Sequence, residues 1–466
     1  MLNKIFSFSL GSLGSLIIGL ISIPIITRLL SPDEFGIASL FMTIATVLST
    51  TALLGTDQSL IRYFFEKNRV SLLMKSIKIS FLTIGILVVI ILNFNKEISL
   101  IISEKNTYGI LLILYILISV IHRFSTIVLR MMQYGYRFSF IQILQRALEL
   151  VLVIVIGTTL VYDHLTLIYS WILSLLILSV LTNVMIIPFW KQANENNSEI
   201  KFSEIISYSG PFAISAILIM LFQSADKLLL GTLSTTREIG IYMATFKIVG
   251  IINVIQSTFT TLWTPVSLKR FRDYPKDKQF FELVFSTTTI IMVTLGVTIA
   301  LFKEAIILVL GPDYREAVFL LPLLLLMPIL YTMSEITVQG VNFYLKSRLH
   351  IRISIVVLIS NISLSLLFIP FFGAKGAALA VAISYILFYG FRTKFGTKFY
   401  SFNTSSTKVF IIIGMYFLWS LEIMFLNFKT IDKIGGLIIL LVTYTLFRKE
   451  YSVICKFINN KVKNYL

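Results

Sequence analysis

The feature that most constrains the fold of this chain is a series of long apolar stretches separated by short polar gaps. A helix needs about 20 mostly apolar residues to cross a hydrocarbon core of roughly 30 Å, so each stretch predicts a membrane span. We count fourteen such stretches, but the last has only 14 residues and is short for a span. Twelve spans is the alternative. The fourteen stretches are residues 5–30, 37–61, 77–94, 108–129, 138–161, 165–188, 206–231, 240–265, 283–303, 317–344, 353–372, 375–391, 409–427 and 434–447.

The composition excludes an ordinary soluble protein. Hydrophobic residues make up 57% of the chain and charged residues 14%, against about 45–50% and about 25% in soluble chains. The apolar runs are continuous and lack the alternation of a membrane β-barrel. The first run continues to Leu30 without a signal-peptide cleavage site, so we expect it to be a retained helix. The sequence therefore predicts an all-α polytopic membrane protein.

Membrane topology explains the net charge of +17. Lys and Arg accumulate in cytoplasmic loops. Of the 40 basic residues, 27 lie at the chain ends or in the gaps on the same side of the predicted membrane as those ends. Nine lie in the gaps on the other side, and four lie within spans. This asymmetry predicts that both termini are cytoplasmic. Because it accounts for the basic excess, no nucleic-acid partner is expected.

A weak repeat indicates two halves. Gly36-Ile37 and Gly240-Ile241 begin the second and eighth predicted helices, 204 residues apart. Six helices separate these positions, so the halves share one orientation, related by a pseudo-two-fold axis along the membrane normal. We expect six-helix bundles at residues 1–190 and 205–397, then two helices and a basic cytoplasmic tail at 407–466. Chance similarity between apolar segments is the alternative.

Polar side chains recur on single faces of several predicted spans in both halves. A charge at the centre of a span costs about 2.5–3.5 kcal/mol, so it needs a partner or a water-filled cavity. The residues expected to line a substrate cavity are Arg62, Arg123, Arg146, Lys227, Asn253 and Gln256. The acids expected to bind a coupling ion, H⁺ or Na⁺, are Asp57, Glu149, Asp226 and Glu335.

Some of these residues also have a structural interpretation. Arg146 and Glu149 are three residues apart and can neutralise one another. Asp226 and Lys227 diverge by about 100° around a helix, which makes them poor mutual partners and favours pairing with another helix.

Arg123 is the sharpest case, because no acid lies within one helical turn of it. It predicts either an anionic cargo or an acid from another helix, such as Asp57. The Ser and Thr residues between positions 39 and 50 can line a cavity or simply allow close helix packing.

The sequence shows no signal of enzymatic chemistry. His122, His164 and His350 occupy unrelated positions and predict no group of metal ligands. No glycine-rich loop ends in Lys-Ser or Lys-Thr, as phosphate-cradling loops do. The gaps between spans stay near 20 residues or fewer. We therefore expect no catalytic residue, no metal and no cofactor other than a coupling ion.

Several short motifs follow one another along most of the chain, through residue 391. They are RLLSPDEFG at 28–36, RY at 62–63, SADK at 224–227, GIY at 240–242, GPDYREA at 311–317, IP at 369–370 and GAKGAA at 373–378. In this order and spacing the chain resembles the oligosaccharide-lipid flippases (Wzx-type) of the polysaccharide-transport branch of the MATE/MOP superfamily.

The resemblance implies a multi-pass protein of the bacterial inner membrane with two six-helix lobes. It implies a flippase that moves undecaprenyl-diphosphate-linked oligosaccharide repeat units to the outer leaflet by alternating access, for O-antigen or other surface polysaccharide. The implied partners are the lipid-linked oligosaccharide, membrane lipids, a polysaccharide polymerase and chain-length proteins. The alternatives are a cation-coupled exporter of small molecules, which would favour an acid-dominated cavity, and a membrane glycan polymerase or ligase, which usually has a large external loop.

Overall fold

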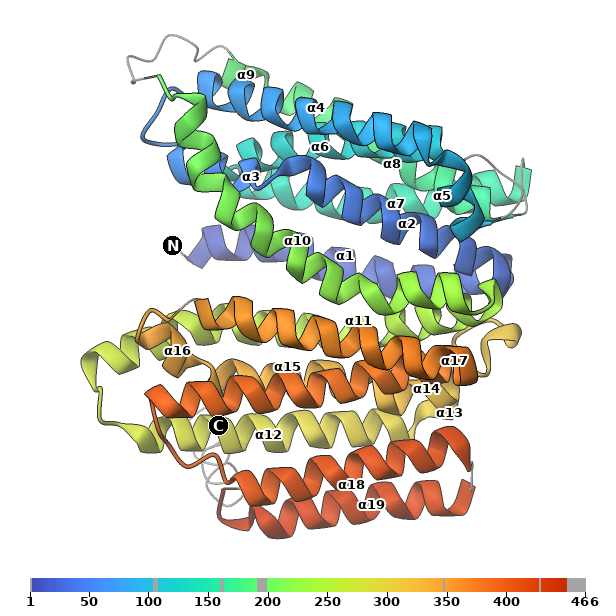
Figure 1. Cartoon of the computed structure of the whole chain (residues 1–466), viewed down its shortest axis with the longest axis vertical. Coiled ribbons are helices and arrows are strands. Elements are labelled where there is room, and N and C mark those ends of the chain that lie inside the picture. The colour runs from blue at the N-terminus through green and yellow to red at the C-terminus, as the bar shows by residue number, and fades with distance from the viewer. Residues whose placement is uncertain are drawn as a thin grey trace. The chain divides into compact units, whose positions relative to one another are not determined.

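A computed structural model describes residues 2–103, 108–159, 163–190, 199–346, 348–426 and 429–450, with side chains from residue 10 onward except those of 429–431. Every regular element in these ranges is helical, which confirms the all-α prediction (Figure 1). Twelve helical segments in these ranges are long and apolar enough to cross a membrane; one of them, Ala317–Phe343, combines three consecutive short helices.

The chain forms two compact units, Met1–Gly240 and Ile241–Leu466. The first unit therefore includes the helix Phe202–Leu233, which the lobe prediction assigns to the second half. The lobe boundaries and the two-fold relation between lobes stay a prediction. The helices of the first unit are α1 (Leu2–Leu29), α2 (Pro32–Leu53), α3 (Thr56–Tyr63), α4 (Arg69–Asn93), α5 (Asn95–Ile102), α6 (Gly109–Met131), α7 (Gly135–Thr159), α8 (His164–Met185), α9 (Ile187–Trp190) and α10 (Phe202–Leu233).

One predicted helix, residues 37–61, is broken into α2 and α3. Leu54 and Gly55 take the left-handed conformation, with φ of 44° and 69°, and end α2. A Cβ atom on Gly55 would lie 2.6 Å from the Ser209 carbonyl oxygen of α10, so glycine allows α10 to pass close to the break. As a consequence, Asp57 lies in the first turn of a new helix, where the helix dipole favours a negative charge.

The second unit contains most of α11, which begins in the first unit, and all later helices. They are α11 (Thr236–Asp273), α12 (Lys278–Leu301), α13 (Lys303–Ile307), the 3₁₀ turn η1 (Pro312–Tyr314), α14 (Ala317–Leu324), α15 (Leu326–Thr337), α16 (Gln339–Phe343), α17 (Arg348–Phe399), α18 (Ser406–Phe425) and α19 (Lys429–Leu446).

The 52-residue helix α17 contains two of the predicted stretches. A continuous helix of that length would be about 78 Å long, far more than one crossing requires. Gly373 breaks it with φ 53° and ψ −127°, between the predicted helices 353–372 and 375–391. Each of the fourteen predicted stretches thus contains a helix. The helix α19 is not one of the twelve candidate spans, so crossing by this segment stays a prediction.

Candidate substrate-binding pocket

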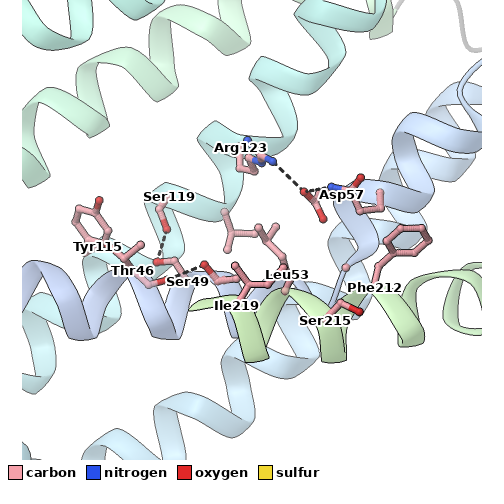
Figure 2. Close-up of a pocket in the computed structure, with 15 residues that line it drawn as sticks. Thr46, Ser49, Leu53, Asp57, Tyr115, Ser119, Arg123, Phe212, Ser215 and Ile219 are labelled. Carbon is pink, nitrogen blue, oxygen red and sulfur yellow. Dashed lines mark hydrogen bonds and ion pairs between the residues drawn. The ribbon is translucent and has the colours of Figure 1, made fainter. Parts of the chain in front are cut away.

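The first unit contains a pocket of about 500 Å³ between α2, α3, α6 and α10 (Figure 2). Its lining combines a charged pair, hydroxyl groups and apolar side chains. The lining residues are Thr46, Ser49, Thr50, Leu53, Gly55, Asp57, Gln58, Tyr115, Ser119, Val120, Arg123, Phe212, Ser215, Ala216 and Ile219.

The charged end of the pocket is the pair formed by Arg123 and Asp57 (Figure 2). The Arg123 guanidinium donates from Nη2 to Asp57 Oδ2 at 3.0 Å, and Gln58 Nε2 donates to the same oxygen at 3.0 Å. The Asp57 side chain is 10% exposed, whereas that of Arg123 is 49% exposed. The carboxylate is therefore nearly buried, whereas about half of the Arg123 side-chain surface is open to another ligand.

Hydroxyl groups occupy the other part of the pocket, along α2 and α6 (Figure 2). Ser119 donates from Oγ to Ser49 Oγ at 2.9 Å and so links the two helices. The Thr46 and Thr50 hydroxyls donate to carbonyl oxygens one turn earlier in α2, which leaves their lone pairs as acceptors. The predicted Ser/Thr stripe therefore contributes both to packing and to the wall of the pocket.

Arg146 and Glu149 pair with each other on α7, as one of the two sequence interpretations predicts. Arg146 Nη1 lies 2.8 Å from Glu149 Oε2, and the two side chains are 49% and 15% exposed. Gln145 donates from Nε2 to the other carboxylate oxygen at 3.2 Å. Neither Arg146 nor Glu149 is among the residues that line the pocket.

Arg62, by contrast, lies outside the pocket, at the end of α3. It pairs with Glu66 one turn later, and both side chains are about half exposed. The hydrogen bond to Glu66 raises the pKa of Arg62 above its ordinary value.

The expectation that Asp226 and Lys227 are poor mutual partners was wrong. Lys227 Nζ lies 3.8 Å from Asp226 Oδ1, and both side chains are largely buried in α10. The 100° between their Cα–Cβ directions does not separate them, because the four-carbon lysine stem can bend back along the helix. Lys227 Nζ also donates to the Gln223 carbonyl oxygen.

The remaining predicted residues, Asn253, Gln256 and Glu335, belong to the second unit. Asn253 and Gln256 lie on α11 and are half-buried, and Asn253 Oδ1 is buried without a hydrogen-bond partner. Glu335 on α15 accepts from Arg392 Nη2 at 2.8 Å, with both side chains only 8% exposed. The Arg392 guanidinium also lies over the Phe388 ring, 4.8 Å from its centroid.

Sequence reasoning missed two buried cations by assigning them to loops. Arg392 follows a predicted span that ends at residue 391, but α17 continues to Phe399 and buries it. Lys303, counted among the outer-face residues, is also buried, with Nζ 2.6 Å from Asp432 Oδ2. The acid within salt-bridge distance of each lies far away along the chain, so no local pattern reveals these pairs.

The prediction that no metal ligands gather was also wrong. Glu34, Asp163 and His164 bring ligand atoms within 4.8 Å of one another at the start of α8. Glu34 is about 130 residues from the other two, so their spacing along the chain hides the group.

Twelve candidate spans among the described residues, all of whose regular elements are helical, define a multi-pass membrane protein, and its first unit has a polar, charged pocket between helices. Residues 1–271, more than half of the chain, match the family described as polysaccharide biosynthesis protein. The chain belongs to this family.

The fold is shared with solved flippases and exporters. The inward closed conformation of the lipid II flippase MurJ is similar with a TM-score of 0.70 and 15% identity, covering 95% of this chain and 99% of that one. The inward-facing conformation of a multidrug resistance MATE family transporter of the MOP superfamily is similar with a TM-score of 0.61 and 14% identity, covering 86% and 95%. No curated protein shows significant sequence similarity to the chain.

Proposed function

We propose that this protein is a flippase that carries a glycan linked to a polyprenyl diphosphate, such as undecaprenyl diphosphate, from the cytoplasmic to the outer leaflet by alternating access. The observation that carries the proposal is the half-exposed Arg123 side chain in a pocket that also offers hydroxyl groups. Phosphate oxygens are preferred acceptors for a guanidinium, and sugar hydroxyls match the Ser and Thr side chains. The family and the flippase-like fold support a lipid-linked cargo.

The physical need for such a pocket follows from the cargo. Burying an ionised or hydroxyl-bearing group in hydrocarbon without partners costs several kcal/mol per group. A site that replaces water with a guanidinium, amides and hydroxyls removes most of that cost, while the lipid tail remains in the bilayer. Outward movement of negative charge also gains roughly 2.3 kcal/mol per charge per 100 mV of inside-negative potential.

Arg123 and Asp57 supply a coupling step by exchange of partners. When a phosphate binds Arg123, the Asp57 carboxylate loses part of its compensation and favours a proton or Na⁺. When the phosphate leaves, Arg123 returns to Asp57 and expels that ion. Cargo and coupling ion are thus bound and released together, and each cation that moves with the cargo cancels one negative charge of the outward electrical gain. Glu149, beside Arg146, is the second acid of the first unit that can act in this way.

We further propose that the protein lies in the bacterial inner membrane with both termini in the cytoplasm. There it would deliver repeat units to a polysaccharide polymerase and its chain-length proteins, as O-antigen or other surface polysaccharide is assembled. The excess of basic residues on one side of the predicted spans supports this orientation.

A transport assay in proteoliposomes tests the proposal. Fluorescent undecaprenyl-diphosphate glycan is placed in both leaflets, and its accessibility to an external quencher is followed over time. Wild-type protein should speed exchange between leaflets, and Arg123→Ala should abolish this while inserting normally. Arg62→Ala is the matched control, because Arg62 pairs with Glu66 outside the pocket and its loss should leave the rate unchanged. Wild-type rates in Arg123→Ala would refute the role of the pocket.

A further inference from the structure

The motif SPDEFG at residues 31–36 is not used by the proposed transport site. Its Glu34 reaches α8, where Oε2 accepts from the His164 backbone N–H at 2.5 Å and lies 2.7 Å from His164 Nδ1. Asp163, the N-cap residue of α8, accepts from the Leu165 N–H at 2.7 Å. One imidazole and two carboxylates therefore meet where α2 and α8 begin.

The three side chains offer the donor set of a divalent transition metal. Their ligand atoms all lie within 4.8 Å of one another, and the ligands of a tetrahedral zinc ion at bond lengths of about 2.1 Å lie about 3.4 Å apart. Small side-chain rotations close the remaining difference. Two carboxylates and a neutral imidazole also carry the two negative charges that balance Zn²⁺.

The second ring nitrogen of His164 has a hydrogen-bond partner of its own, Tyr108. His164 is 7% exposed, and its Nε2 lies 2.7 Å from the hydroxyl of Tyr108 at the start of α6. Metal-binding histidines almost always direct their second ring nitrogen at such a partner, which fixes the tautomer and the ring plane. With the ring proton on Nε2, where the Tyr108 oxygen accepts it, Nδ1 presents its lone pair toward Glu34 and Asp163.

We propose that Glu34, Asp163 and His164 form a Zn²⁺ site that joins the start of α2 to the start of α8, with Tyr108 of α6 orienting the imidazole. The fourth position of the ion is left to water. The predicted topology places this end of α8 on the outer face of the membrane, and none of the four residues lines the pocket of about 500 Å³. The site is therefore independent of the proposed cargo-binding residues.

Metal titration of the full-length protein in nanodiscs tests this site. Zn²⁺ binding is measured by competition with a chromophoric chelator, and Co²⁺ is added separately to read the coordination from its visible absorption. Wild-type protein should bind one Zn²⁺ per chain and give the Co²⁺ absorption of a four- or five-coordinate site. His164→Asn, which keeps an amide donor for Glu34, should lose both signals. Tyr108→Phe should weaken Zn²⁺ binding by about 10- to 100-fold.

Two control variants separate this site from adventitious binding. His122→Asn removes another buried histidine of the same unit. Asp33→Asn removes the acid next to Glu34; the Asp33 carboxylate accepts a hydrogen bond from Thr236. Both should retain wild-type Zn²⁺ affinity. The proposal is overturned if wild-type protein binds no Zn²⁺, or if His164→Asn and Glu34→Gln bind it as tightly as the wild type.

Discussion

Replacing Asp57 by asparagine should strengthen the binding of a diphosphate headgroup, because Asp57 competes with the ligand for Arg123. We take a phosphate on the exposed side of the guanidinium to lie about 6 Å from the carboxylate, roughly twice an N···O hydrogen-bond distance. The repulsion between two unit charges at that distance is about 0.7 kcal/mol in water and about 2.8 kcal/mol at an effective dielectric constant near 20. Asp57 is nearly buried and Arg123 half exposed, so we expect a value between these limits, about 1.4 kcal/mol, or about tenfold in Kd.

Arg123→Ala should have the opposite effect on the same ligand. A hydrogen bond to a charged group contributes about 1.5–3 kcal/mol, so its loss weakens binding by about 10- to 150-fold. In the double variant Asp57→Asn/Arg123→Ala, the gain from Asp57→Asn should remain, because the repulsion between the Asp57 carboxylate and the phosphate does not depend on Arg123.

Equilibrium titration of protein in nanodiscs with a short-chain prenyl diphosphate measures these affinities directly. Glu66→Gln is the matched control, since Glu66 is also paired with an arginine in the first unit but lies outside the pocket. It should bind like the wild type. Weaker binding by Asp57→Asn, or unchanged binding by Arg123→Ala, would refute competition for one guanidinium.

Three further outcomes are expected in thermal unfolding experiments. Arg392→Met leaves a buried glutamate without its cation and should lower the free energy of unfolding by about 3–5 kcal/mol; a loss below about 1 kcal/mol would contradict burial of the pair. Gly240→Ala should destabilise the first unit, because the added Cβ would lie 1.8 Å from a carbonyl oxygen of α2. Gly85→Ala is the control and should be neutral or stabilising, since Gly85 has open space around it. The hydrogen bond from Arg270 holds the pKa of Asp277 below its ordinary value. That pair therefore stabilises the fold above about pH 3.9 and loses its effect as the pH falls through the depressed pKa. Asp277→Asn should thus lower the unfolding temperature at pH 7, and the two proteins should converge in acid.

Most of the fold could be predicted from the sequence, because a bilayer imposes one length and one polarity on every span. The errors lie where backbone conformation depends on packing. The break before α3 uses Leu54, a residue type that rarely adopts a positive φ, and the close passage of α10 at Gly55 is a tertiary contact. No periodicity in residues 37–61 marks that position.

The site was only partly predictable. Arg123 stood out because its own helix supplies no acid, and its contact with Asp57 was one of two predicted outcomes. The α10 wall, with Phe212, Ser215 and Ile219, was not predicted, because an apolar helix facing lipid and one facing a cavity have similar composition. The close approach of α10 at Gly55 is a tertiary contact that no local pattern reports.

Several ion pairs lie among the charged residues of the spans, and the exposure of the cation in each pair indicates whether it can bind cargo or only stabilises the fold. The pairs of Arg392 with Glu335 and of Lys303 with Asp432 bury both members, so neither cation can accept a ligand without first leaving its acid in an apolar surrounding. In the Arg123 pair the acid is buried but the cation is half exposed, and the Arg146 pair has the same asymmetry. A guanidinium held from one side can gain a phosphate on the other without that cost. The buried acid keeps its contact but shares its cation with the phosphate, so it loses part of its compensation and favours a proton or Na⁺, which couples the cargo to that ion.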